Sequence, residues 1–131
     1  MVSHDAVSND DEAFGFHAIM TIRSCDPAAM TRQSVMQFLE EFVDTIGMKV
    51  HATNQLHPQA ERYGYTDAVR GVTGFYPIEE SGISIHCVDR SKTAYLDIFS
   101  CKFFDFKTAV NFARKNFGSS ARVTHSMFLV R

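Results

Sequence analysis

The chain of 131 residues has no tryptophan and only three cysteines, and it lacks both a strong net charge and a long hydrophobic run. Cys25, Cys87 and Cys101 are an odd number without disulfide-framework spacing, so we expect free thiols and a reducing, cytoplasmic setting. No apolar run approaches the length of a membrane span. The formal charge of −2 gives no electrostatic reason to expect a nucleic acid or an anionic membrane as partner.

The N-terminal segment MVSHDAVSNDDEA lacks the basic start and the apolar centre of a signal peptide. Its polar, acidic composition predicts a disordered tail over residues 1–13. The chain as a whole is 45% hydrophobic and 12% aromatic, which is ordinary for one globular domain. We therefore expect a single domain over residues 14–131.

Hydrophobic periodicity predicts two helices. Residues 25–47 carry apolar side chains at helical spacing, with Asp26 as the expected N-cap and Gly47 as the expected end. In the second helix, Asp105 is the expected N-cap and Gly118 follows the last turn. Both helices have an apolar stripe that has to be buried against another layer.

Strand composition predicts an antiparallel or mixed sheet beside these helices. The expected order is β-α-β-β-β-α-β, an α+β two-layer sandwich whose mostly antiparallel sheet is covered on one face by two helices. The loop is expected over 57–70 and a hairpin turn over 89–92. The strand segments are 14–22, 48–56, 71–78, 82–88, 93–101 and 122–130.

The stretch EESGISIHCVDRSKTAYLDIFSC, residues 79–101, carries serine, histidine and cysteine at spacings that suit a reactive site. If its two strands pair as a hairpin, we expect His86 and Cys101 to reach one rim of the sheet. Ser81 lies at the junction of two strands, where backbone strain is most easily stored. The same spacing also fits a turn serine, a sheet histidine and a buried thiol. Side-chain alternation places Cys101 on one face with Tyr95, Asp97 and Phe99.

Four motifs in register resemble those of the short, bacterial-type S-adenosylmethionine decarboxylase proenzymes. That family carries a Gly-Val-Ser/Thr-Gly strand, then Glu-Ser, a histidine, and an Asp-hydrophobic-Phe-Ser/Thr-Cys strand. This chain has GVTG at 71–74, ES at 80–81, His86, and DIFSC at 97–101. The opening GFHAIMTIRSCD also resembles the first strand of the family, so the resemblance extends over nearly the whole domain.

The resemblance implies that the chain makes its own cofactor. The Ser81 hydroxyl would attack the carbonyl of Glu80, and Thr73 would hydrogen-bond the oxyanion that forms. His86 would then remove the Ser81 α-proton, and elimination would break the chain. The products would be a β chain of residues 1–80 and an α chain that begins with a pyruvoyl group at former Ser81.

The same resemblance implies a decarboxylase of polyamine biosynthesis, acting on a small amino-acid-type substrate. The pyruvoyl carbonyl would form a Schiff base with the substrate amine and accept electrons as CO₂ leaves. Cys101 would be the general acid that reprotonates the substrate α-carbon. A homodimer whose sheets and clefts are built by two protomers is expected from the short family members.

Several positions depart from the family pattern. Gly82 stands where the family has a histidine, and Val88 and Arg90 replace a tryptophan and a glutamate of a His-Thr-Trp-Pro-Glu segment. Asp67 lies near the place of an aromatic residue that stacks on adenine in the family. These changes keep the residues of the chemistry and alter those of nucleoside recognition.

The departures leave the substrate open. S-adenosylmethionine follows from the resemblance, whereas L-ornithine or L-arginine would use the same chemistry and need a carboxylate, for which Asp67 and Asp89 are candidates. Tyr65 and Glu80 complete the predicted substrate-binding residues. A non-catalytic binding domain on the same fold is the alternative from another class. The histidines show no zinc-like spacing, so no metal site is expected.

Overall fold

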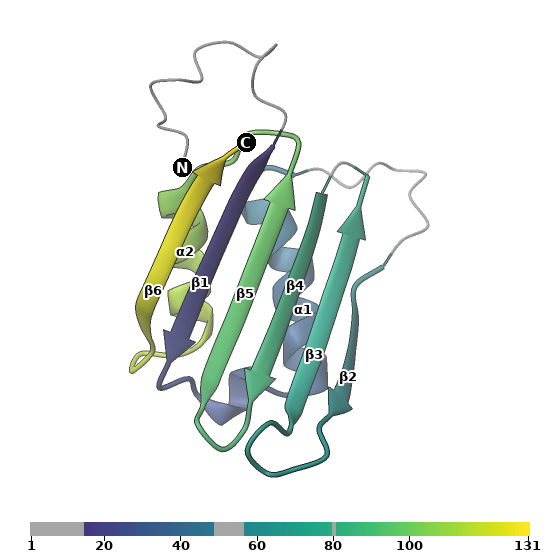
Figure 1. Cartoon of the computed structure of the whole chain (residues 1–131), viewed down its shortest axis with the longest axis vertical. Coiled ribbons are helices and arrows are strands. Elements are labelled where there is room, and N and C mark those ends of the chain that lie inside the picture. The colour runs from purple at the N-terminus through teal and green to yellow at the C-terminus, as the bar shows by residue number, and fades with distance from the viewer. Residues whose placement is uncertain (1–14, 49–56, 80) are drawn as a thin grey trace.

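The computed structural model describes residues 15–48, 57–79 and 81–131. Six strands and two α-helices follow one another in the order β-α-β-β-β-β-α-β, with a short 3₁₀ turn before the first helix (Figure 1). The elements are β1 Phe16–Arg23, η2 Pro27–Ala29, α1 Arg32–Thr45, β2 Gln59–Tyr63, β3 Gly71–Ile78, β4 Ser81–Val88, β5 Thr93–Ser100, α2 Phe106–Asn116 and β6 Arg122–Val130.

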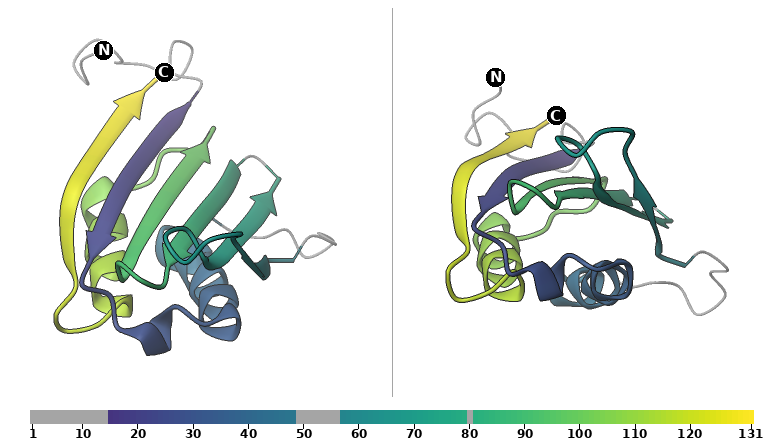
Figure 2. Two further views of the ribbon diagram at one scale, coloured as in Figure 1. Left: turned by 60° about the horizontal axis from the view of Figure 1, so that its bottom comes forward. Right: turned by 90° about the horizontal axis from the view of Figure 1, so that it is seen from below.

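The six strands form one sheet in the order β2-β3-β4-β5-β1-β6, and every neighbouring pair is antiparallel. Both helices lie on the same side of this sheet, and no described element covers its other side (Figures 1 and 2). The predicted α+β two-layer sandwich is confirmed. The structure has four strands between the helices, whereas the expected order has three, although four strand segments were expected there.

Strand β2 corrects the prediction of a loop over 57–70. Gln59–Tyr63 pairs with β3 as the edge strand, and Ala60 is its one buried residue. Such a polar, exposed strand lacks the alternation that reveals a half-buried strand in a sequence. Of the expected strand at 48–56, residues 49–56 lie outside the described residues.

The start of the first helix also differs from the prediction. Asp26 caps the short η2 turn, where its side chain accepts a hydrogen bond from the Ala28 amide. The N-cap of α1 is Thr31, whose hydroxyl accepts from the Ser34 amide at 3.1 Å. A second capping residue five positions along therefore starts a new helix instead of continuing the first turn.

The core lies between the helices and the sheet. Helix α1 buries five apolar side chains, and strands β4 and β5 turn every second residue toward them. No helix among the described residues is long and apolar enough to cross a membrane. The buried stripe of α1 is Val35, Phe38, Leu39, Phe42 and Val43.

Gly74 of β3 permits the close approach of α1 to the sheet. A Cβ atom at this position would lie 2.7 Å from Cγ1 of Val35 and 3.1 Å from Cδ1 of Leu39. These distances are shorter than van der Waals contact, so the helix would have to move. One glycine of the GVTG motif is therefore required by packing.

We expect Gly74→Ala to lower the free energy of unfolding by about 1–3 kcal/mol, because the added methyl overpacks the α1–β3 contact. Urea unfolding measures this directly. Gly82→Ala is the matched control, since a Cβ there lies 3.5 Å from Phe75 Cε1, an ordinary contact. Its unfolding free energy should stay within about 0.5 kcal/mol or rise slightly, as strand glycines are entropically costly. Equal losses in the two variants would contradict the packing argument.

Candidate active site

Thr73 and His86 form a hydrogen-bonded pair on the open face of the sheet. They are opposite one another in the β3–β4 register, and Thr73 Oγ1 lies 2.7 Å from His86 Nδ1. His86 Nε2 lies 3.3 Å from the Val69 carbonyl oxygen, which can only accept. In the neutral ring Nε2 therefore carries the proton, and Nδ1 accepts from the Thr73 hydroxyl.

This pairing links the hydroxyl of Thr73 to the protonation of His86. A hydroxyl has one proton, and beside a neutral ring that proton is shared with Nδ1. When both ring nitrogens are protonated, Nδ1 donates to Thr73 Oγ1 and the hydroxyl proton becomes available to another acceptor. When His86 holds the second proton, the Thr73 hydroxyl is therefore available as a hydrogen-bond donor to another group.

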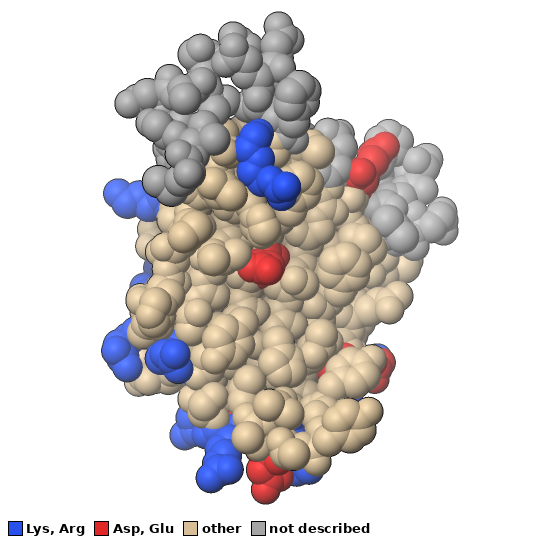
Figure 3. All heavy atoms as spheres, in the orientation of Figure 1, with Lys and Arg blue, Asp and Glu red and all other residues tan. Residues whose placement is uncertain are grey.

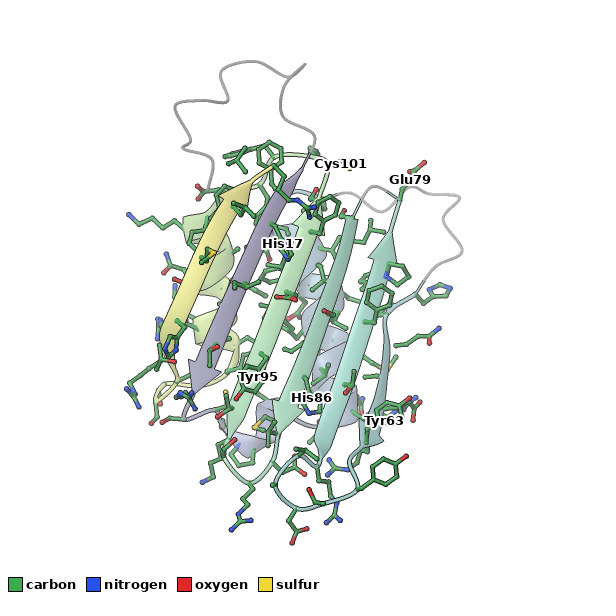
Figure 4. The ribbon with its side chains drawn as sticks, in the orientation of Figure 1. His17, Tyr63, Glu79, His86, Tyr95 and Cys101 are labelled. Atoms are coloured by element: carbon green, nitrogen blue, oxygen red, sulfur yellow. The ribbon has the colours of Figure 1, made fainter. Side chains whose placement is uncertain are left out.

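Ser81 occupies the opposite end of β4. It is the first residue of that strand, opposite Ile78 of β3 and Ser100 of β5. Its hydroxyl donates to the Met48 thioether at 3.3 Å, on the side of the sheet that the helices cover. Cys101 follows Ser100 and is exposed, so it lies at the same edge as Ser81 (Figure 4).

Within one chain, the structure places Ser81 far from His86. His86 is five residues after Ser81 along one strand, a span of about 17 Å. The register pairs His86 with Tyr95, while Ser81 pairs with Ser100. The expectation that His86 and Cys101 share a rim was therefore wrong, because a hairpin of eight-residue strands places them near opposite ends (Figure 4).

A cavity of about 860 Å³ lies on the open face around the Thr73–His86 pair. Strands β1, β4, β5 and β6 all contribute side chains to it, and the face is largely uncharged (Figure 3). Four large apolar side chains are also exposed on this face. They are Ile19, Phe75, Tyr95 and Met127, with exposed fractions of 41%, 50%, 46% and 50%.

A family model described as S-adenosylmethionine decarboxylase matches residues 16–128, nearly the whole chain. The chain belongs to the S-adenosylmethionine decarboxylase family. This family consists of pyruvoyl-dependent decarboxylases. No curated protein matches the chain.

Three of the four predicted substrate-binding residues, Tyr65, Asp67 and Asp89, lie in loops at the His86 end of the sheet. Asp67 accepts a hydrogen bond from Arg70 at 2.7 Å, and Asp89 forms an ion pair with Arg62. Tyr65 is fully exposed. Each of the two carboxylates thus has a guanidinium partner already. The structure does not bring these residues to Ser81, and Glu80 lies outside the described residues.

The three thiols differ in what they can do. Burial raises the pKa of the Cys25 thiol to about 11 and that of Cys87 to about 12. Both side chains lie in the core, which fits small apolar residues rather than reactive ones. Cys101 is the exposed thiol, so it is the one open to a substrate.

Two contacts of the candidate site could not be read from the sequence. The Val69 carbonyl orients His86 through a main-chain atom, which carries no side-chain signal. Met48 reaches Ser81 from the end of α1, across 33 positions of the chain. No three His, Cys, Asp or Glu side chains within the described ranges are grouped so that they could hold a metal ion.

Proposed function

We propose that this chain is a self-cleaving, pyruvoyl-dependent decarboxylase of polyamine biosynthesis, with S-adenosylmethionine as the substrate that the family suggests. The observation that carries the proposal is the Thr73–His86 hydrogen bond at 2.7 Å. It joins Thr73, the predicted donor to the oxyanion, to His86, the predicted base for the Ser81 α-proton. The family match over residues 16–128 supports the reaction class.

The position of Ser81 fits a cleavage site. A break before it would fall between β3 and β4, leaving β1 to β3 with α1 in one piece and β4 to β6 with α2 in the other. The pairs β1–β5, β1–β6 and β3–β4 all cross between the pieces. The sheet would therefore hold the cleaved protein together.

In the proposed cleavage, the Ser81 oxygen bonds to the Glu80 carbonyl carbon, and the bond from that carbon to the Ser81 nitrogen breaks. The hydroxyl proton passes to the freed amine, so the peptide bond becomes an ester. Thr73 donates its hydroxyl proton to the oxyanion, a role open to it when His86 is protonated. Neutral His86 then takes the Ser81 α-proton, and the ester leaves as the carboxylate of Glu80. The elimination leaves dehydroalanine at the new N-terminus, and hydrolysis of its imine tautomer gives the pyruvoyl group and releases ammonia.

Since one chain keeps Ser81 and His86 about 17 Å apart, we propose that two chains build the site. The open, apolar face is suited to stacking against a second sheet. A two-fold axis parallel to the sheets and perpendicular to the strands would lay the Ser81 end of one chain over the Thr73–His86 end of its partner. The Ser81 hydroxyl, which points to the covered side beside Met48, would turn to the open face to enter this site. Each dimer would then contain two complete sites.

The pyruvoyl group would supply an electron sink for loss of CO₂. The residues of the chain then have two tasks. Cys101, beside Ser81 in the same chain, would hold the proton that is returned to the substrate α-carbon. The Thr73–His86 pair of the partner subunit would line the opposite side of the same site.

A cytoplasmic location for the protein remains a prediction.

A second candidate is the same reaction on L-ornithine or L-arginine. Gly82, Val88 and Arg90 replace the family residues named above, and Asp67 lies near the place of an aromatic side chain. These changes favour a smaller substrate without an adenine ring. A non-catalytic domain on this fold would instead keep Ser81 intact.

The intact mass under denaturing conditions tests the proposal. The wild-type protein is expected to give two pieces of 80 and 51 residues, the lengths that a break after Glu80 leaves in the chain of 131. The smaller piece should begin with pyruvoyl, whereas Ser81→Ala should give one unbroken chain. A wild-type chain that stays whole after prolonged incubation would remove the support for a decarboxylase.

A further inference from the structure

We propose that Asp97 binds the positive charge of the substrate, whether this is a sulfonium, an ammonium or a guanidinium group. The substrate class is an amino acid with a second cationic centre a few bonds from its α-carbon. This inference rests on the proposed function, and it assigns the selecting carboxylate to the sheet instead of to the loops that carry Asp67 and Asp89.

Asp97 lies in the middle of the open face. It is opposite Ser84 of β4 and Ile19 of β1, and all three line the 860 Å³ cavity. It is the only acidic residue of the described strands β1, β3, β4, β5 and β6. Figure 3 shows negative charge near the centre of this largely uncharged face, with positive charge above it.

No described residue makes a hydrogen bond or an ion pair with the Asp97 carboxylate. Asp67 and Asp89, by contrast, are each held by an arginine. The histidines closest to it on the face are His17 and His86, diagonal neighbours across the ladders at about 7–8 Å between Cα atoms. Tyr95 lies two residues before Asp97 on β5, and the Arg131 guanidinium lies over the ring of Phe99, two residues after it. His125 lies farther along the same face, opposite Thr21 of β1. Asp97 is therefore the carboxylate of this face that is free for a ligand.

The spacing matches the size of the substrate. In the proposed dimer the substrate α-carbon is bound where Ser81 of one chain meets the Thr73–His86 pair of the other. Asp97 of the chain that carries this pair lies one diagonal step away, about 7–8 Å. A cation three to five bonds from the α-carbon extends roughly 4–6 Å, given bonds of about 1.5 Å. The remaining distance is that of an ion-paired hydrogen bond.

Desolvation strengthens the case for a ligand cation. Asp97 is exposed in the single chain, and a second sheet on the open face would remove it from water. A carboxylate taken from water is strongly destabilised unless a cation accompanies it. In the proposed site the substrate supplies this cation.

Titration calorimetry on the Ser81→Ala chain tests the inference, because that chain binds without converting the ligand. We compare S-adenosylmethionine, L-ornithine and L-arginine with L-citrulline, the uncharged counterpart of arginine. At least one cationic compound should bind, and arginine should bind more tightly than citrulline if the guanidinium is the preferred cation. Adding Asp97→Asn should weaken the best cationic ligand about 10- to 100-fold and leave citrulline within about twofold.

Asp44→Asn is the matched control, since it removes the same charge from an exposed position of α1, on the other side of the sheet. Unchanged affinity for the cations in the Asp97→Asn chain would overturn the inference, and so would a Ser81→Ala chain that binds none of them. The intact mass of the wild-type chain reports on the proposed function separately. An unbroken wild-type chain with Asp97-dependent binding would support the cation site and contradict the proposed decarboxylase function.

Discussion

Co-expression of a Ser81→Ala chain with a His86→Ala chain is expected to restore cleavage to the His86→Ala chain. In a mixed dimer that chain still carries Ser81, and the Ser81→Ala partner still carries Thr73 and His86. One complete site therefore forms across the interface. With random pairing of equal amounts, up to roughly half of the His86→Ala chains are in mixed dimers and should be cut. Different tags on the two chains allow each to be followed by intact mass.

Each variant alone should remain whole, because the Ser81→Ala dimer has no nucleophile and the His86→Ala dimer has no base. Loss of a general base slows such a step about 10²- to 10⁴-fold. The control replaces the Ser81→Ala partner with a chain that carries both substitutions, which removes every His86 and should abolish the rescue. Failure of the mixed sample to cleave, with size exclusion showing dimers, would mean that Ser81 and His86 act within one chain after a rearrangement of β4.

The fold followed from the sequence wherever side chains were buried on one side. The stripe of α1 and the alternation of β4 and β5 are all seen in the structure. Strand β2 was missed because Ala60 is its only buried residue and its pairing with β3 depends on main-chain hydrogen bonds. The start of α1 was misplaced because Asp26 and Thr31 are both good N-caps, and tertiary packing chooses between them.

The sequence suggested candidate residues for the site but could not give their geometry. Motif spacing identified Thr73, Ser81 and His86, but their placement depends on the register of β3, β4 and β5. Five positions along one strand mean about 17 Å and a change of face, which follows only once Ser81 is known to begin β4. The sequence left Ser81 at a junction between strands. This separation supports the proposal, implied already by the family resemblance, that two chains share the site.

Cys101→Ala is expected to leave cleavage intact and to reduce turnover about 10²- to 10⁴-fold, the usual contribution of a general acid. Cys101 lies at the Ser81 end of the sheet, and no step of the proposed cleavage uses its thiol. The two roles are thus carried by different residues. The intact mass should still show both pieces, while CO₂ release from the preferred substrate falls in kcat.

Thiol labelling provides the control for this variant. At mildly alkaline pH the native protein should react with iodoacetamide at Cys101 alone, because burial raises the pKa of Cys25 to about 11 and that of Cys87 to about 12. Labelling should lower the turnover of the wild-type enzyme in proportion to the thiol modified, and Cys101→Ala should take up no label until it is unfolded. Cys101→Ser should recover part of the turnover, since a hydroxyl still carries a proton. Full turnover in Cys101→Ala would mean that another group, or water, returns the proton to the α-carbon.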